Sequence, residues 1–441
     1  MGRGLLVIMS QCDVAQYIGR QPKDRIVADY ARYLNPGRVE VYRALGVDFV
    51  PGKREGVWLW DVEGQHRVLN CRSSGGVFDL GHRPPRVVEA VRQAMLEVDV
   101  GDHMLLSELR AGLGRRLAEI TPGDIQYSTL SPGGAEAIEI GIKLARGYTG
   151  RSGVISVKGG YHGHTGFALA AGEDVFRSKF GSMPPGFKRV PFGDADALAA
   201  AVDEGTAGVI METIPATAGI LIPPSDYYPR VRQICDSVGA VMILDEVQAG
   251  LGRTGRMWAI EEWGVVPDIL VSGKGLSGGV YPMSATCHRP HLDAFFRDNP
   301  FIHLASFGGA ELGCVAALAM LEQVTEPGFM EHVVAMGQRF AAGLAELSQS
   351  YDVVAEVRQR GLMIGLELAE PRMGLVMTSL LARNGVLAVF ADFRPATIQL
   401  MPPLIIQEGE VDFVLEALDK SLRALVQGAT LPDAVLTRLL L

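Results

Sequence analysis

Short apolar runs alternate with amphipathic segments through the middle of the chain. Uncharged runs of this length predict strands that are buried on both faces, as in a parallel sheet. They are Val154–Val157, Gly208–Met211, Val241–Leu244 and Ile269–Val271. Tyr227–Val238 has apolar residues at helical spacing and predicts a helix between two of them. The alternation from about 125 to 290 therefore predicts a mostly parallel sheet wrapped by helices.

The two ends of the chain have other patterns. Residues 1–55 are mixed, and their prolines, Pro36 among them, predict that no long helix forms there. Residues 56–64 and 67–71 predict a strand hairpin, and 86–97 a helix. After about residue 312, two helices precede strands near 353–358, 362–368, 386–390 and 397–400, which predicts a smaller α/β lobe. The tail after Gln427 is helical in pattern and either packs on that lobe or hangs free.

This pattern predicts an α/β fold in three parts. A segment at 1–70 joins a small domain at 311–441, and residues 71–310 form a large domain. A chain of 441 residues is also too long for one compact core.

Composition excludes several classes of function. The formal net charge is −9 and no basic run occurs, which argues against nucleic acid and anionic membranes as partners. No apolar window is long enough to span a bilayer, and the run Leu5–Met9 is too short for a signal sequence. The five cysteines, Cys12 among them, form no CxxC pair, so free thiols in the cytoplasm are expected.

An acid and a lysine follow two of the predicted strands. Asp245 comes directly after Val241–Leu244, and the carboxyl ends of parallel strands are where open α/β sheets bind ligands. Lys274 follows Ile269–Val271 and is flanked by glycines that leave its amine open to a planar ring. Pyridoxal phosphate needs this pair, a lysine for the Schiff base and an acid that keeps the pyridine nitrogen protonated. The alternative is an ordinary helix-capping aspartate and a surface lysine.

Three further positions suit the same cofactor. Gly133, Gly134 and Ala135 open a helix with bare N–H groups, which favours phosphate, although an ordinary glycine-rich turn has the same pattern. Tyr161 lies between glycines after a strand and can lie flat on a ring, or else fill the core. We also expect its neighbour His162, and Glu212 at the end of another strand, to contact the cofactor.

Together these motifs resemble the class III pyridoxal-phosphate aminotransferases of fold type I, over residues 30–425. The resemblance implies a large domain with a mostly parallel seven-stranded sheet and a smaller α/β domain. The motifs at 35–37, 298–301 and 401–404 are most similar to the putrescine (diamine) aminotransferase branch. The motifs of the whole family are at 80–82, 134–137, 161–163, 244–248, 250–255, 272–276 and 306–309.

The resemblance implies a role for each site residue. Lys274 would form the Schiff base and move the proton, Asp245 would pair with the ring nitrogen, and Gln248 would lie beside the ring hydroxyl. Tyr161 would stack on the ring, and Gly134 and Ala135 would bind the phosphate. Ser306 would reach the phosphate of the other subunit, so a homodimer with shared sites is expected. The resemblance implies no metal.

Two departures from the family bear on the substrate. Family members often pair a loop glutamate with an arginine that grips the carboxylate of 2-oxoglutarate; here those positions hold Thr217 and Gln399. Their joint loss is physically consistent, because a buried charge without its partner costs several kcal/mol. Arg394 is either a displaced carboxylate clamp or a solvated loop residue. The pocket walls are expected from Tyr42, from residues 73–78 including Phe78, and from Arg394.

The main hypothesis is an aminotransferase that moves an amino group between a primary amine or ω-amino compound and a keto acid or aldehyde. The loss of the switch pair keeps a second hypothesis open. A racemase, epimerase or aminomutase of the same family returns the amino group to the same carbon skeleton and needs no such switch. A non-enzymatic role would leave the pair Asp245 and Lys274 idle.

Overall fold

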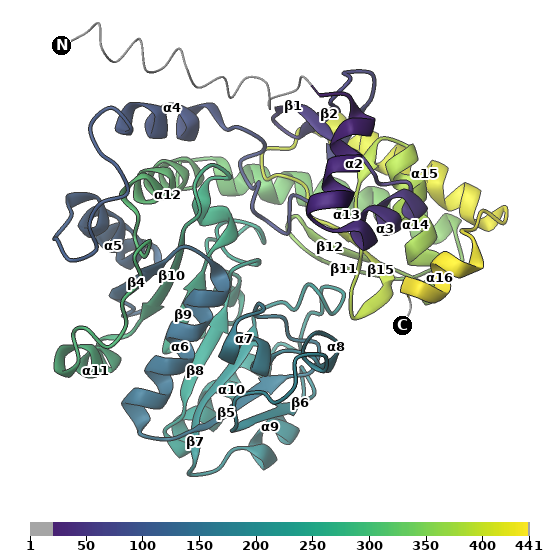
Figure 1. Cartoon of the computed structure of the whole chain (residues 1–441). Coiled ribbons are helices and arrows are strands. Elements are labelled where there is room, and N and C mark those ends of the chain that lie inside the picture. Colours follow the sequence, from purple (N-terminus) through teal and green to yellow (C-terminus); the bar gives the residue numbers. More distant parts are fainter. Residues whose placement is uncertain (1–20, 440–441) are drawn as a thin grey trace, which may run out of the picture.

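Two lobes make up the part of the chain that the computed structural model describes, residues 21–439 (Figure 1). The large lobe contains a seven-stranded sheet with the order β4-β10-β9-β8-β7-β5-β6. Only β10 runs antiparallel to its neighbours, so the prediction of a mostly parallel sheet is confirmed. Its strands are β4 (Tyr127–Ser131), β5 (Gly153–Val157), β6 (Phe187–Val190), β7 (Thr206–Glu212), β8 (Val241–Asp245), β9 (Ile269–Ser272) and β10 (Ser284–His288).

Both faces of this sheet are apolar, which explains why its central strands are uninterrupted apolar runs. Along β8, Val241 and Ile243 pack in the core on one face, and Met242 and Leu244 in the core on the other. The first face is covered by α6, and helices that include α10 and α12 cover the second. The helices of this lobe are α4 (Pro85–Ala94), α5 (Glu108–Ile120), α6 (Gly134–Thr149), α7 (Gly166–Ala171), α8 (Asp174–Arg177), α9 (Ala195–Ala201), α10 (Tyr227–Val238), α11 (Asp293–Asp298) and α12 (Glu311–Val324), with the short 3-10 helices η2 (Ala259–Trp263), η3 (Lys274–Ser277) and η4 (Pro290–Leu292).

The small lobe is built on an antiparallel sheet of four strands with the order β11-β12-β15-β14. Its core is separate from those of the large sheet and is supplied mainly by α13, α14, α15 and the inward side chains of the sheet. The elements are α13 (Phe329–Ser350), β11 (Val354–Arg360), β12 (Met363–Leu368), α14 (Pro371–Arg383), β13 (Val386–Leu387), β14 (Val389–Ala391), β15 (Arg394–Leu400), α15 (Glu408–Val426) and α16 (Asp433–Leu439). The second, smaller α/β lobe is thus confirmed.

The N-terminal segment contains two short helices that were not predicted, α2 (Lys23–Tyr33) and α3 (Pro36–Leu45). No long helix occurs in residues 21–55, as the prolines predict. Pro36 begins α3 rather than breaking it, because the first helical position needs no free N–H. The side chain of Asn35 caps this helix by accepting a hydrogen bond from Arg38 N at 3.0 Å.

The N-terminal strands connect to the C-terminal part of the chain. The expected hairpin forms from β2 (Trp58–Asp61) and β3 (Arg67–Asn70), with β1 (Pro51–Glu55) at its edge. Strand β3 pairs in parallel with β13, and α3 contacts α14 and α16 on the right of Figure 1. The boundaries of the three predicted parts stay a prediction.

Other expectations concern the ends of the chain. The run Leu5–Met9 and Cys12 lie outside the described residues. Leu431 and Leu436 are buried in the small-lobe core, so the tail packs on that lobe as far as it is described. The other four cysteines, Cys71, Cys235, Cys287 and Cys314, are free and buried. No helix within residues 21–439 is long and apolar enough to cross a membrane.

Candidate active site

The carboxyl ends of three neighbouring strands bring the predicted residues together. Glu212 at the end of β7 lies in register with Asp245 at the end of β8, and β9 leads through Gly273 into Lys274. Asp245 and Lys274 line one cavity of about 300 Å³. The cavity is also lined by Gly134, Ala135, Tyr161, His162, Gly163, His164, Glu212, Val247 and Gln248. The structure thus places most of the predicted cofactor residues around one space.

Asp245 is held by two hydrogen bonds. Its Oδ2 accepts from His162 Nδ1 at 2.8 Å, and its Oδ1 accepts from the backbone N–H of Val247 at 3.0 Å. The side chains of His162 and Asp245 are only 0% and 5% exposed. Burial acts to lower the pKa of His162, but its hydrogen bond and charge contact with Asp245 outweigh burial and raise it. His162 therefore gains a proton more readily than its burial alone would allow.

Glu212 is a second buried acid beside this pair. Its carboxylate accepts a hydrogen bond from the backbone N–H of Tyr161 at 2.8 Å. Burial first, and then the negative charge of Asp245, raise the pKa of Glu212 to about 7. Glu212 therefore holds a proton more readily at neutral pH than an exposed glutamate does.

Lys274 has a strained backbone. Its φ of +42° lies in the left-handed region, which costs a side-chain-bearing residue about 1–2 kcal/mol. Burial lowers the pKa of its amine, although the charges of Asp245 and Glu212 oppose this shift. The next residue must be small, since a Cβ on Gly275 would come within 2.5 Å of Asp79 Oδ2. The backbone thus fixes where the amine enters the cavity, and burial favours its reactive neutral form.

The start of α6 provides a place for an anion. Helix α6 begins at Gly134, and its N-cap Gly133 makes no side-chain capping bond. The first N–H groups of the helix are therefore left without intrahelical partners. Gly163 packs against this turn, because a Cβ there would come within 2.5 Å of Ala135 Cβ. Bare N–H groups and the helix dipole favour a phosphate at this end of the cavity.

Tyr161 borders the cavity from the other side. Its ring makes edge contacts with His164 and Phe176, at 5.4 and 5.6 Å between ring centroids. These contacts hold the ring in place. Gln248 lies across the cavity, where its Nε2 donates to Met401 Sδ at 3.6 Å. Both residues line the same cavity, and their contacts with a planar ring stay a prediction.

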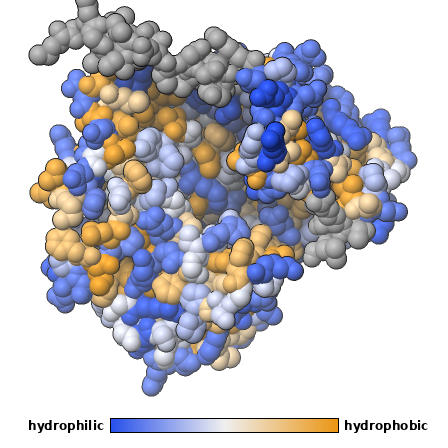
Figure 2. Space-filling model, in the orientation of Figure 1, coloured by the Kyte–Doolittle hydropathy of each residue, from blue (hydrophilic) through white to orange (hydrophobic). Residues whose placement is uncertain are grey.

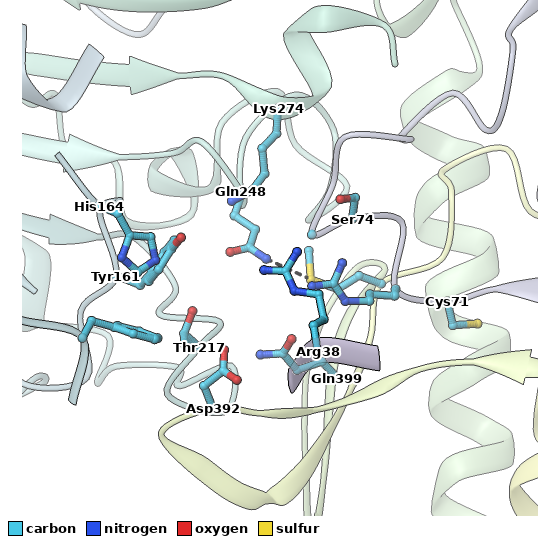
Figure 3. A pocket seen from close by; sticks show the side chains of 14 residues that line it. Arg38, Cys71, Ser74, Tyr161, His164, Thr217, Gln248, Lys274, Asp392 and Gln399 are labelled. Carbon is cyan, nitrogen blue, oxygen red and sulfur yellow. Dashed lines mark hydrogen bonds between the residues drawn. The ribbon is translucent and has the colours of Figure 1, made fainter. Parts of the chain in front are cut away.

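A second cavity of about 460 Å³ opens beside the first and shares Tyr161, His164, Gln248 and Lys274 with it (Figure 3). Thr217 and Gln399 both line it, although they are far apart in the sequence. Gln399 Nε2 donates to the carbonyl oxygen of Ala216 at 2.6 Å, directly beside Thr217. Thr217 and Gln399, which the family resemblance relates to a glutamate and an arginine, therefore lie close together at the cavity wall.

Five predicted residues line neither cavity. Gly133 immediately precedes the lining residue Gly134 and is the N-cap of α6. Tyr42 is exposed on α3, and the ring of Phe78 contacts that of His82 at 4.2 Å. The guanidinium of Arg394 is held by Glu367, with Nε donating to Oε1 at 2.8 Å. Ser306 is exposed on the loop before α12. Arg394 is thus paired with an acid on the neighbouring strand of the same sheet and does not line the cavity.

Sequence reasoning missed three charged residues of the second cavity, Arg38, Arg72 and Asp392. Arg38 lies on a helix that was not expected. Arg72 precedes the run Ser73–Gly76, which was expected to supply a pocket wall without its charge being considered. Asp392 is two residues before Arg394, the residue that drew attention instead. The signal for Arg72 in the sequence is its charge directly before a glycine-containing loop.

The described residues fit pyridoxal phosphate. His162 Nε2 is buried and has no hydrogen-bond partner among them, which leaves a free polar atom at the cavity wall. The α6 N-terminus suits a phosphate, the ring of Tyr161 at the cavity wall suits an aromatic partner, and Asp245 suits a protonated ring nitrogen. Lys274 supplies the amine. No feature of this cavity conflicts with the cofactor.

Comparison with known proteins agrees with this geometry. The sequence model of the family described as aminotransferase class-III matches residues 43–422. A protein of Archaeoglobus fulgidus named as an uncharacterized aminotransferase is 50% identical over 402 residues, 91% of this chain and 95% of that one.

Solved structures with the same fold include two transaminases. An ornithine aminotransferase from Toxoplasma gondii, described with partial occupancy of PLP at its active site, is 25% identical with a TM-score of 0.85, covering 97% of this chain and 99% of its own. An (S)-enantioselective ω-transaminase from Thermomicrobium roseum is 27% identical with a TM-score of 0.84, covering 91% and 99%.

Proposed function

Since the chain belongs to the class III aminotransferase family, we propose that it transfers an amino group between a primary amine or ω-amino compound and a keto acid or aldehyde. The protein is an enzyme of fold type I that depends on pyridoxal phosphate. The observation that carries the proposal is the placement of Lys274 and Asp245 on one cavity that opens into a second, larger one.

We propose these roles for the residues of the first cavity. Gly133, Gly134 and Ala135 hold the phosphate through their N–H groups, and Tyr161 covers one face of the ring. Asp245 keeps the ring nitrogen protonated, and His162 orients Asp245 through the 2.8 Å hydrogen bond. Glu212 supports this side through the backbone of Tyr161, and Gln248 lies by the ring hydroxyl. The cofactor then supplies an electron-accepting ring that stabilises negative charge on the substrate carbon.

Lys274 performs the proton transfer in this proposal. Its amine accepts the proton from the substrate carbon and delivers it to the cofactor side, which requires a neutral amine at neutral pH. Burial lowers the pKa of Lys274 in that direction. The walls of the first cavity and the left-handed backbone at Lys274 fix the position of the amine.

The neutral pair Thr217 and Gln399 bears on the choice of acceptor. Side chains without charge at these positions cannot grip and release a second carboxylate as a glutamate and arginine pair does. We propose that the enzyme does not handle 2-oxoglutarate through that switch. The motifs similar to the putrescine branch support a diamine or ω-amino compound as donor.

We also propose a homodimer with shared active sites. Large apolar side chains are exposed on two loops of the large lobe, with exposures of 67% for Leu105, 65% for Phe301 and 59% for Phe307. Figure 2 shows apolar side chains gathering on the side of this lobe where α4, α5 and α11 lie. Ser306 is on the second loop, so a partner that covers it would receive this hydroxyl at its phosphate. The free thiols support the proposal of a cytoplasmic enzyme.

The experiment uses the enzyme loaded with pyridoxal phosphate, candidate amines and no acceptor. Stoichiometric conversion of the bound cofactor to its amine form supports transamination. If the substrate instead takes up deuterium from the solvent, inverts its configuration and shows no net loss of amine, the racemase hypothesis would replace transamination. Lys274→Ala should abolish both the visible absorption of lysine-bound cofactor and turnover, and normal turnover by this variant would refute the assignment.

A further inference from the structure

Two arginines that face the second cavity have no role in the proposal above. Arg38 and Arg72 both line the cavity beside Lys274, and neither forms a direct ion pair with an acid among the described residues. The charge of Arg72 does act on Asp392, whose pKa burial raises and Arg72 lowers. The lining residues that carry charge are these two arginines, Lys274 and a single acid, Asp392. Once the lysine nitrogen is bound to the cofactor, the two arginines and Asp392 give the cavity wall a net positive charge.

The structure holds Arg72 beside the reacting amine through an unusual loop. Four consecutive residues after it have positive φ, with values of +42° at Ser73, +53° at Ser74, +69° at Gly75 and +101° at Gly76. The side chain of Asn70 fixes the start of this loop by accepting from Arg72 N at 3.1 Å and Ser73 N at 2.9 Å. Such a run of left-handed residues is strained, and strain of this kind is concentrated at functional sites.

The same loop approaches the lysine closely. A Cβ on Gly75 would come within 2.7 Å of Gln248 Nε2 and 3.4 Å of Lys274 Cε. A glycine at this position therefore lets the backbone after Arg72 pass directly over the reacting end of the cavity. A larger residue would keep the loop, and with it Arg72, farther from the amine.

Arg38 reaches the cavity from α3. Its backbone N–H is held by the capping side chain of Asn35, and its guanidinium donates to the hydroxyl of Tyr30 at 3.3 Å. Figure 3 shows Arg38 extending into the space between Gln248 and Gln399. The remaining donors of this guanidinium face the cavity with no acid assigned to them. A carboxylate with two oxygens matches the donor pattern of such a group.

We propose that Arg38 and Arg72 together form the carboxylate anchor of the substrate cavity, taking the place of the arginine that position 399 lacks. The substrate or acceptor would then carry a carboxylate near the carbon that reacts. This inference rests on the proposed function, since it needs a cofactor bound to Lys274. It assigns substrate specificity to the N-terminal helices and to the loop after β3, not to Arg394.

The test compares two aminooxy compounds that differ in one carboxylate. Aminooxyacetate and methoxyamine each displace the lysine nitrogen from the aldehyde carbon of the bound cofactor, form an oxime and free the Lys274 amine, which changes the cofactor absorption. The second-order rate constants are measured with the loaded enzyme and with Arg38→Gln, Arg72→Gln and Arg72→Lys. Arg43→Gln is the matched control, because Arg43 is exposed on the same helix as Arg38 and does not line the cavity.

Each arginine-to-glutamine change in the pair should slow the reaction with aminooxyacetate by about 10-fold or more, the value of a lost charge-assisted hydrogen bond. The reaction with methoxyamine and both reactions of Arg43→Gln should stay within about 2-fold, and Arg72→Lys should keep part of the preference. Equal slowing of both probes, or no change with aminooxyacetate, would overturn the anchor while leaving the aminotransferase intact. Absence of any spectral change in the unaltered enzyme would instead refute the proposed function.

Discussion

Restoring charge at positions 217 and 399 tests whether the second cavity is the place where acceptors are chosen. The perturbation is Thr217→Glu combined with Gln399→Arg, with each single change as a control. Thr217 is 9% exposed, and Gln399 donates to Ala216 O at 2.6 Å, so the two positions are adjacent on one wall. The double change would place a carboxylate and a guanidinium at the two positions that we propose correspond to the family's switch.

The two single changes should lower the stability of the fold by different amounts. Gln399→Arg removes the hydrogen bond to Ala216 O, and leaving such a carbonyl unpaired costs about 1–3 kcal/mol. It also adds a cation to a cavity whose charged residues are mostly positive already. Thr217→Glu buries a carboxylate, but Arg38 and Arg72 line the same cavity and offset part of the desolvation cost. We therefore expect Gln399→Arg to be the more destabilising change.

Together the two changes should compensate each other. Charges that meet in a partly buried site couple by about 1–3 kcal/mol, which corresponds to a factor of about 5–150. Thermal unfolding measures the stability side, with a shift of about 2–4 °C per kcal/mol for a cooperative unit of 150–250 residues. The functional side is a half-reaction. Enzyme loaded with the amine form of the cofactor is mixed with 2-oxoglutarate or pyruvate, and the return of the cofactor absorption gives kcat/KM for each.

We expect kcat/KM for 2-oxoglutarate, divided by kcat/KM for pyruvate, to rise in the double variant only. A carboxylate at position 217 alone should raise KM for both keto acids, because it competes for the arginine pair. If the double variant keeps the original ratio, and its thermal shift equals the sum of the two single shifts, then positions 217 and 399 do not form the switch and their alignment is wrong.

Other changes probe the first cavity and its supports. Asp245→Asn should leave cofactor binding measurable by absorption but slow the single-turnover half-reaction by about 100-fold or more, because the ring nitrogen loses its charged partner. Gly75→Ala places a side chain at φ +69°, costs about 1–2 kcal/mol of backbone strain and should raise KM for carboxylate substrates more than it lowers kcat. Arg253→Met should lower the free energy of unfolding by about 3–5 kcal/mol, because the side chain of Asp79 is 4% exposed and would lose its ion-pair partner; adding Asp79→Asn should recover part of the lost thermal stability. Burial raises the pKa of Glu212 to about 7, so the stabilisation it provides is present below its ordinary pKa of about 4.5 and is lost as the pH rises through about 7. The thermal midpoint of the cofactor-free protein should therefore fall between about pH 5 and pH 8, and Glu212→Gln should flatten part of this fall.

The strands of the large sheet could be predicted because local pattern and burial agree there. Each apolar run forms a strand with both faces covered, and Tyr227–Val238 is a helix with the predicted ends. The meeting of Asp245 and Lys274 followed from a topological rule, since parallel strands end at one edge. The helices α2 and α3 were missed because Pro36 was judged by its usual effect inside a helix rather than by its effect at the first position.

The wall of the second cavity depends on physics that no local pattern contains. Whether an arginine faces a substrate or an acid is decided by which acid lies within reach after folding. Arg394 sits on β15 and finds Glu367 on the neighbouring strand β12, so its charge is used within the small lobe. Arg72 follows a strand end and enters a loop whose backbone is held in the left-handed region by Asn70, so its charge stays available at the cavity. The two arginines thus differ in whether an acid pairs directly with them after folding. If specificity is set in this way, it depends on which charged side chains at the cavity wall lack a partner, and not on which residues occupy the family's usual positions. A substitution that gives Arg72 an acidic partner and preserves the fold should therefore change the choice of substrate.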